Sequence, residues 1–189
     1  MPPASQGKGM HLLLFAAFAL ATPNAAPADA CLASVPDALR QVLARQFRDV
    51  RLPLETDSPL EDRKAVVATG KACLLMASAD FNGDGRTDLV VLLPRKASPG
   101  YRLVVALDSP SGFRVTSVES STTPFANLYL NAAPAGTYSH TQDYEFQPSP
   151  GAAERIVSAQ AGFWFGGLEA AADVYFLKQG RWLHVHAVD

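Results

Sequence analysis

Residues 80–88 constrain the fold of this chain more than any other stretch. They read DFNGDGRTD, with Asp or Asn at the first, third, fifth and ninth positions and glycine at the sixth. Calcium prefers oxygen ligands, and a tightly curved backbone with Asp and Asn at alternate positions can direct several of them at one ion. The spacing therefore predicts a calcium loop. Its predicted ligands are the side chains of Asp80, Asn82, Asp84 and Asp88 and the backbone carbonyl of Arg86.

The residues that follow the loop decide which kind of calcium loop it is. An EF-hand has a bidentate glutamate at its twelfth position, where this chain has Val91. The run LVVLL at residues 89–93 is typical of a buried strand and not of an amphipathic helix. We therefore expect the loop to connect two strands.

The pattern D-x-[DN]-x-D-G-x-x-D, followed directly by an apolar strand, resembles the FG-GAP and VCBS-type repeats over residues 74–93. The resemblance implies calcium as the cofactor and the ligand set given above. Those repeats usually occur in series and form propeller blades, and a propeller needs about four blades of four strands. The chain has one copy, so it is more similar to small exported bacterial proteins that carry a single such loop in an α+β domain.

A metal-free turn is the alternative interpretation of residues 80–88. Asn-Gly and Asp-Gly are strong hairpin-turn dipeptides, so a turn alone explains both glycines. It does not explain why Asp80 and Asp88 flank them, because gathered carboxylates repel one another. Three carboxylates without a bidentate glutamate predict weak binding, with a dissociation constant of about 10⁻⁴ M.

Periodicity predicts an α+β fold in which an N-terminal helix or two pack on a mainly antiparallel β-meander sheet, not a full propeller. Apolar residues recur at helical spacing between Leu39 and Val50. The later runs are separated by short turn signals, which favour antiparallel neighbours. Residues 132–153 are instead predicted to form a long irregular loop. The expected strands are at 72–78, 88–94, 101–108, 113–119, 125–131, 154–160, 171–178 and 181–187.

Residues 1–30 have the features of a signal peptide, with an apolar run at 12–21 and an A-x-A site ending at Ala30. The run is too short to cross a bilayer, which takes about 20 residues. We therefore expect an exported, periplasmic or secreted protein with one domain at 31–189 and no transmembrane segment. The net charge of −2 gives no electrostatic basis for binding nucleic acid.

The two cysteines, Cys31 and Cys73, are the only candidates for a disulfide. An exported protein with two cysteines commonly pairs them, which would stabilise the fold by about 4 kcal/mol in the chain-entropy model. Lipidation of Cys31 is the alternative, although the three residues before it do not match a lipid-attachment signal. We expect the disulfide.

No nucleophile elbow, phosphate loop, HExxH or CxxC motif occurs, so the sequence gives no positive sign of catalysis. His184 and His186 share one face of the last predicted strand. A two-residue turn at Gln179-Gly180 would place Asp173 opposite His186, whereas a bulged turn would shift the register by one. The first placement would suit a periplasmic hydrolase that uses Asp173 and His186.

Two further features suggest binding. Phe163, Trp164 and Phe165 stand between glycines and could form an exposed face for a carbohydrate or protein ligand, although buried aromatics are commoner. The 132–153 loop could act in an inhibitor or immunity-type protein. The favoured interpretation is an exported, noncatalytic protein in which calcium orders residues 80–88 and stabilises the sheet.

Overall fold

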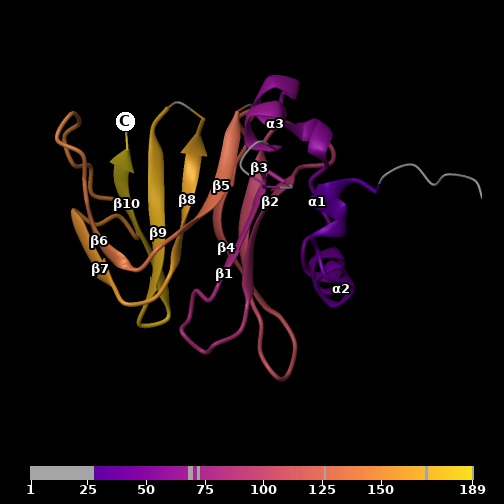
Figure 1. The fold of residues 1–189 in the computed structure, drawn as a ribbon, viewed down its shortest axis with the longest axis horizontal. Coiled ribbons are helices and arrows are strands. Elements are labelled where there is room, and N and C mark those ends of the chain that lie inside the picture. The colour runs from indigo at the N-terminus through magenta and orange to yellow at the C-terminus, as the bar shows by residue number, and fades with distance from the viewer. Residues whose placement is uncertain (1–27, 68–69, 72, 126, 169, 189) are drawn as a thin grey trace, which may run out of the picture.

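Two four-stranded antiparallel sheets lie face to face in the computed structural model, with helices outside one sheet and a β-hairpin outside the other (Figure 1). The structure describes residues 28–67, 70–71, 73–125, 127–168 and 170–188. Residues 1–27, which hold most of the predicted signal peptide, lie outside these ranges. Among the described residues, no helix is long and apolar enough to cross a membrane.

The helices come first in the chain. They are α1 (Ala30–Ala33), α2 (Asp37–Gln46), the 3₁₀ helix η1 (Glu55–Asp57) and α3 (Leu60–Val67). Helix α2 forms where apolar residues recur at helical spacing, and it buries Leu39 and Leu43 in the main core. Pro36 is the N-cap of this helix, and Ser34 just before it is the C-cap of α1.

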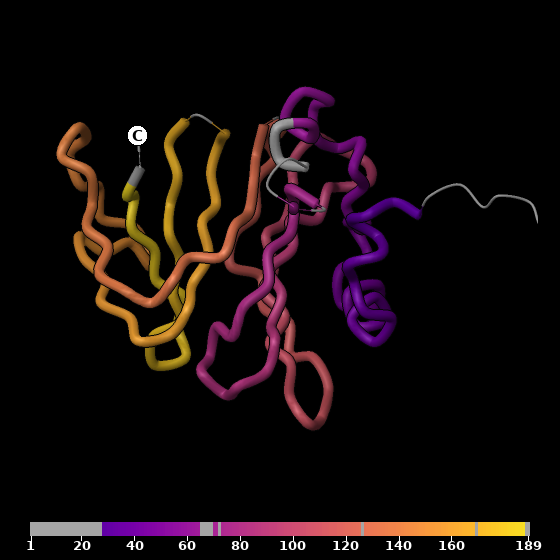
Figure 2. Tube along the Cα trace, viewed as in Figure 1, coloured from indigo at the N-terminus to yellow at the C-terminus, as the bar shows by residue number. Residues whose placement is uncertain are grey.

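Sheet 1 has the strand order β1-β2-β3-β4, with each strand antiparallel to the next in sequence. The helices cover one face of this sheet and the second sheet covers the other (Figures 1 and 2). This explains why all seven residues of β2 are buried, as the continuous apolar run predicts. The strands are β1 (Met76–Ala79), β2 (Asp88–Pro94), β3 (Tyr101–Leu107) and β4 (Arg114–Ser121).

Sheet 2 has the strand order β10-β9-β8-β5. Its inner face joins sheet 1 in the main core, and its outer face packs against the β6–β7 hairpin in a second, smaller core. The two sheets also approach each other at one edge, where the Leu130 amide donates to the Leu74 carbonyl at 2.8 Å. The strands are β5 (Leu128–Ala133), β6 (Gly136–Ser139), β7 (Arg155–Ser158), β8 (Gly162–Gly167), β9 (Ala172–Lys178) and β10 (Arg181–Val188).

The prediction of a mainly antiparallel, sheet-rich fold with N-terminal helices is confirmed, but the single meander is wrong because the strands divide into two sheets and a hairpin. Strands β6 and β8 were not predicted, and β6 lies inside the expected 132–153 loop. Strand β8 contains three glycines, which weaken any strand signal. A Cβ at Gly162 would lie 2.1 Å from the Tyr175 carbonyl oxygen, so the close approach of β9 requires glycine there.

The predicted disulfide is present and joins Cys31 in α1 to Cys73, which precedes β1. Both cysteines are buried in the main core. The bridge fastens the helical layer to the edge of sheet 1. It also engages the sulfur of Cys31, so no thiol remains there for a lipid.

Candidate functional site

The Asp80–Asp88 loop connects β1 to β2, as the sequence predicts. Ala79 and Asp88 are paired across the two strands, so the loop begins and ends at one point of sheet 1. Gly83 and Gly85 have φ angles of 77° and 84°, a conformation that glycine adopts without strain. The two glycines therefore allow the backbone to turn back within a few residues.

The carboxylate of Asp80 organises the turn. One oxygen accepts the amides of Gly83 at 2.7 Å and Asp84 at 3.1 Å, and the other accepts the Gly85 amide at 2.8 Å. These hydrogen bonds lower the pKa of Asp80, with the Gly85 amide as the largest cause. The side chains of Asn82 and Asp84 are joined at 3.0 Å. Three of the four predicted side-chain ligands thus belong to one small hydrogen-bonded network.

Asp88 differs from the other three because it is fully buried. Its oxygens accept the amides of Phe81 at 2.9 Å and Asp108 at 2.8 Å. Burial is the largest influence on its pKa and raises it, whereas the two amide hydrogen bonds lower it. The negative charges of Asp84 and Asp80 raise the pKa further. Asp80 and Asp84 are therefore close enough to Asp88 to repel its negative charge.

The loop has the oxygen ligands that calcium prefers, but its carboxylates do not converge on one position. Within the described residues, no group of three His, Cys, Asp or Glu side chains is positioned to hold a metal ion. The Arg86 side chain pairs with Asp108 at 2.9 Å and not with a loop carboxylate. Each oxygen of Asp88 accepts one amide and so keeps acceptor capacity, and Asp84 is exposed. A calcium ion would therefore require the side chains of the loop to rearrange so that their oxygens converge.

Phe81 fixes the loop to the other sheet. Its ring is fully buried and makes edge contacts with Phe163 of β8 at 5.7 Å and Trp182 of β10 at 6.1 Å between centroids. The second residue of the loop thus reaches across the main core. The loop therefore contacts sheet 2 directly through the Phe81 ring.

The predicted exposed face at Phe163, Trp164 and Phe165 is wrong. Phe163 and Phe165 are buried in the main core, and Trp164 packs in the second core against Tyr138 at 5.5 Å between ring centroids. Alternation along β8 sends these side chains to opposite faces, and both faces are covered. Phe163 and Phe165 are therefore inaccessible to a ligand, and Trp164 is only partly exposed.

A second candidate site lies at β10, the edge strand of sheet 2. Of the two alternatives for the turn, the structure has the two-residue one: Gln179 and Gly180 have φ angles of 51° and 78°, and His186 pairs with Asp173. His186 Nδ1 lies 2.7 Å from Asp173 Oδ1. The pair opens on a pocket of about 270 Å³ that is covered by the segment between β6 and β7. Its lining residues from that segment include His140, Tyr144, Glu145 and Ser149.

The segment over the pocket is held to β10 by backbone hydrogen bonds. The Thr141 amide donates to the His186 carbonyl at 2.9 Å, and the Ala153 amide donates to the His184 carbonyl at 2.9 Å. No local pattern in the sequence predicts that residues 140–153 lie along β10. His140, Tyr144 and Glu145 were therefore missed as site residues.

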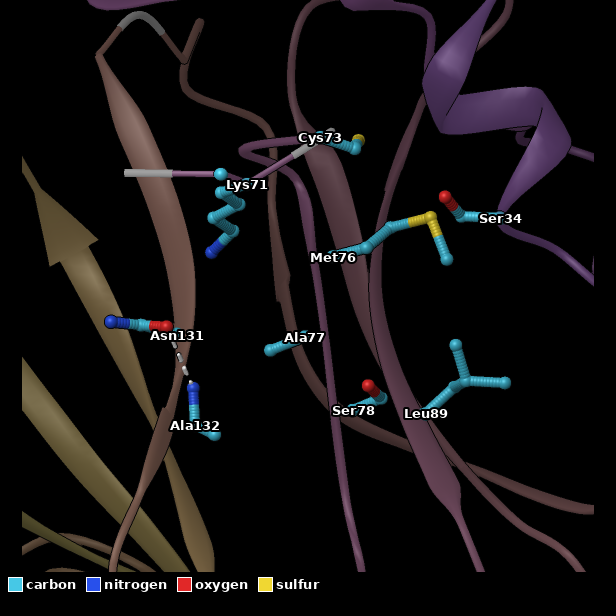
Figure 3. Close-up of a pocket in the computed structure, with 10 residues that line it drawn as sticks. Ser34, Lys71, Cys73, Met76, Ala77, Ser78, Leu89, Asn131 and Ala132 are labelled. Carbon is cyan, nitrogen blue, oxygen red and sulfur yellow. Dashed lines mark hydrogen bonds between the residues drawn. The ribbon is translucent and has the colours of Figure 1, made fainter. Parts of the chain in front are cut away.

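Lys71 faces a larger pocket of about 510 Å³ between β1 and β5 (Figure 3). Its ammonium group donates to the Leu130 carbonyl, and its stem points toward Asn131 and Ala132. Burial lowers the pKa of Lys71 to about 8. It is the only ionisable side chain among the described residues that line this pocket, apart from the disulfide-bonded Cys73.

Comparison with known proteins identifies no relative: no family model matches the chain, and neither a curated protein nor a solved structure matches it significantly.

Proposed function

We propose that the protein is an exported, noncatalytic calcium-binding protein in which calcium bound at residues 80–88 stabilises the contact between the two sheets. The observation that carries this proposal is the placement of Phe81. The ring stands between two predicted ligands, Asp80 and Asn82, and packs on Phe163 and Trp182 of sheet 2. Ordering the loop around an ion therefore orders the joint between the sheets.

Electrostatics support the same proposal. The charges of Asp80 and Asp84 raise the pKa of Asp88, so the loop holds repulsion that a cation would relieve. Among the described residues, no Lys or Arg forms an ion pair with these three carboxylates. Calcium would supply the missing positive charge. The disulfide, which is typical of oxidising compartments, supports export.

Isothermal titration with calcium tests binding directly. Chelator-treated protein should bind one calcium ion per chain with a dissociation constant of about 10⁻⁴ M. Asp84→Asn should weaken this binding, because it removes one of the three negative charges of the loop while an amide oxygen remains at that position. Asp84 suits the test because it is exposed and its side-chain hydrogen bonds are confined to the loop. Asp88 is unsuitable for the test because it also holds two backbone amides.

Asp37→Asn is the matched control, because it removes the same charge from an exposed residue of α2. This variant should bind calcium like the wild type. An equal loss of calcium affinity in both variants would mean that the net charge of the protein, and not the loop, attracts the ion. An absence of binding to the wild type at millimolar calcium would refute the proposal.

A hydrolase is the second candidate, and the Asp173–His186 pair in a pocket favours it. Among the lining residues, Ser149 is the only serine, threonine, cysteine or lysine, so it would be the nucleophile. This candidate predicts hydrolysis of a small p-nitrophenyl ester that is lost in both Ser149→Ala and His186→Gln. Activity that survives either substitution would exclude this mechanism.

A further inference from the structure

The pocket at β10 brings together two imidazoles whose Nδ1 atoms are already engaged. His186 Nδ1 is bonded to Asp173 Oδ1, and His140 Nδ1 lies 2.6 Å from the Thr141 carbonyl oxygen. A carbonyl oxygen can only accept, so Nδ1 of His140 carries the proton. The Asp173 carboxylate imposes the same tautomer on a neutral His186. Both rings therefore present a bare Nε2 lone pair.

This arrangement is typical of histidines that bind metal ions. A metal-ligating histidine almost always donates its other ring N–H to a carboxylate or a backbone carbonyl, which fixes the ring and increases its basicity. His186 has the first kind of partner and His140 has the second. The two rings come from separate segments and are held together by the Thr141–His186 backbone hydrogen bond.

The spacing of the two rings suits one ion. With metal–nitrogen bonds of about 2 Å, two imidazoles on one tetrahedral ion have ring centroids roughly 5 to 6 Å apart. The centroids of His140 and His186 are 5.9 Å apart, with their planes inclined at 45°. The pair is thus near the separation that a shared ion requires.

The charge of the pocket also favours a cation. Glu145 and Asp173 line it, and no lysine or arginine is among its described lining residues. No three ligating side chains converge in the described part of the chain, so the two imidazoles would be the first protein ligands of the ion. Water or Glu145, which is exposed at the pocket, would complete the coordination.

We propose that His140 and His186 bind a divalent transition-metal ion through their Nε2 atoms, with Asp173 and the Thr141 carbonyl as supporting partners. Imidazole ligands suit zinc, copper and nickel, whereas calcium takes oxygen. The site is therefore chemically separate from the 80–88 loop, and it stands whether or not that loop binds calcium. A metal bound here would occupy the lone pair that a serine hydrolase needs on His186, so zinc would inhibit ester hydrolysis.

Zinc titration of chelator-treated protein without a histidine tag, in excess calcium at pH 7.5, tests the proposal. We expect one equivalent of zinc to bind, and His140→Gln and His186→Gln each to weaken binding at least about tenfold. Asp173→Asn should weaken it by roughly 10- to 100-fold, the usual effect of losing a supporting partner. Asp84→Asn, in the calcium loop, should leave zinc binding unchanged.

The outcomes separate this site from the calcium loop. Loss of zinc binding in Asp84→Asn, or unchanged binding in both histidine variants, would overturn the proposal. If a histidine variant fails to fold, ¹⁵N spectra of the wild type give the answer: zinc should shift the Nε2 resonances of His140 and His186. No shift at one equivalent of zinc would equally overturn it.

Discussion

Asp84 and Asp88 are the same residue type in one short loop, yet their environments give them different roles. Asp88 is buried and holds two backbone amides, so it belongs to the architecture of the turn. The carboxylate of Asp84 is exposed and accepts hydrogen bonds from Asn82 and Arg86 within the loop. Removing Asp88 would leave buried donors unsatisfied, whereas the donors that bond to the Asp84 side chain are exposed to water.

Lys71 should reduce the stability of the fold at neutral pH. Burial lowers its folded pKa from 10.5 to about 8, so the folded state disfavours the charged form. Its destabilising effect is fully present below pH 8 and is relieved as the pH rises from 8 to 10.5. Replacing Lys71 also removes its hydrogen bond to the Leu130 carbonyl, which should cost about 1 kcal/mol and so offset part of the gain in stability. We therefore expect Lys71→Met to increase the free energy of unfolding at pH 7 by about 2 kcal/mol.

Urea denaturation of wild type and variant at several pH values checks this prediction. The stability difference should shrink between pH 8 and 10.5, because only the wild type has a lysine to discharge there. Lys64→Met, at an exposed site on α3, should have almost no effect. A Lys71→Met protein that is less stable than the wild type at pH 7 would contradict the argument.

At the scale of elements, the loop and sheet 2 act as one unit through Phe81. Phe81→Ala removes a fully buried ring that contacts Phe163 and Trp182, which should cost about 3–5 kcal/mol. Urea denaturation in chelator measures this cost without any contribution from calcium. Phe113→Ala, at a partly buried residue that packs on the same core, is the control and should cost less. Equal costs would mean that Phe81 has no special role at the joint.

Sequence patterns predicted the elements whose signals are local. Strand β2 follows from its apolar run. The sequence allowed two registers for β9 and β10, and the positive φ angles of Gln179 and Gly180 show that the two-residue turn is the one formed. Strand β8 was missed because its glycines are explained only by the neighbouring backbone of β9. The division into two sheets depends on contacts between distant strands, which periodicity does not encode.

The candidate sites follow the same rule. The oxygen ligands of the 80–88 loop are close in sequence, so their spacing alone suggests calcium. The Asp173–His186 pair belongs to one of the two registers that the sequence allowed for a single hairpin. His140 and Glu145 join that pair only because residues 140–153 fold along β10, and no pattern within the segment indicates this placement.

At the scale of the whole molecule, a few specific contacts join the two sheets. Glu119 of β4 accepts hydrogen bonds from Tyr101 of β3 at 2.6 Å and from Tyr175 of β9 at 2.8 Å. Burial and the Glu119 carboxylate raise the pKa of both tyrosines, so both hydroxyls stay protonated and keep donating. Phe81 forms a further contact from the 80–88 loop. Binding at the loop should therefore raise the stability of the entire fold and not only of its own strand.

Thermal unfolding with calcium and with chelator tests this central claim most directly. At about 10 mM, a hundred times a dissociation constant of about 10⁻⁴ M, calcium should stabilise the fold by about 2.7 kcal/mol. For a chain of this size that corresponds to a rise in Tm of roughly 5 to 10 °C, in one cooperative transition. The rise should be clearly smaller in Asp84→Asn. An unchanged Tm in the wild type, or an equal rise in Asp84→Asn, would contradict the account.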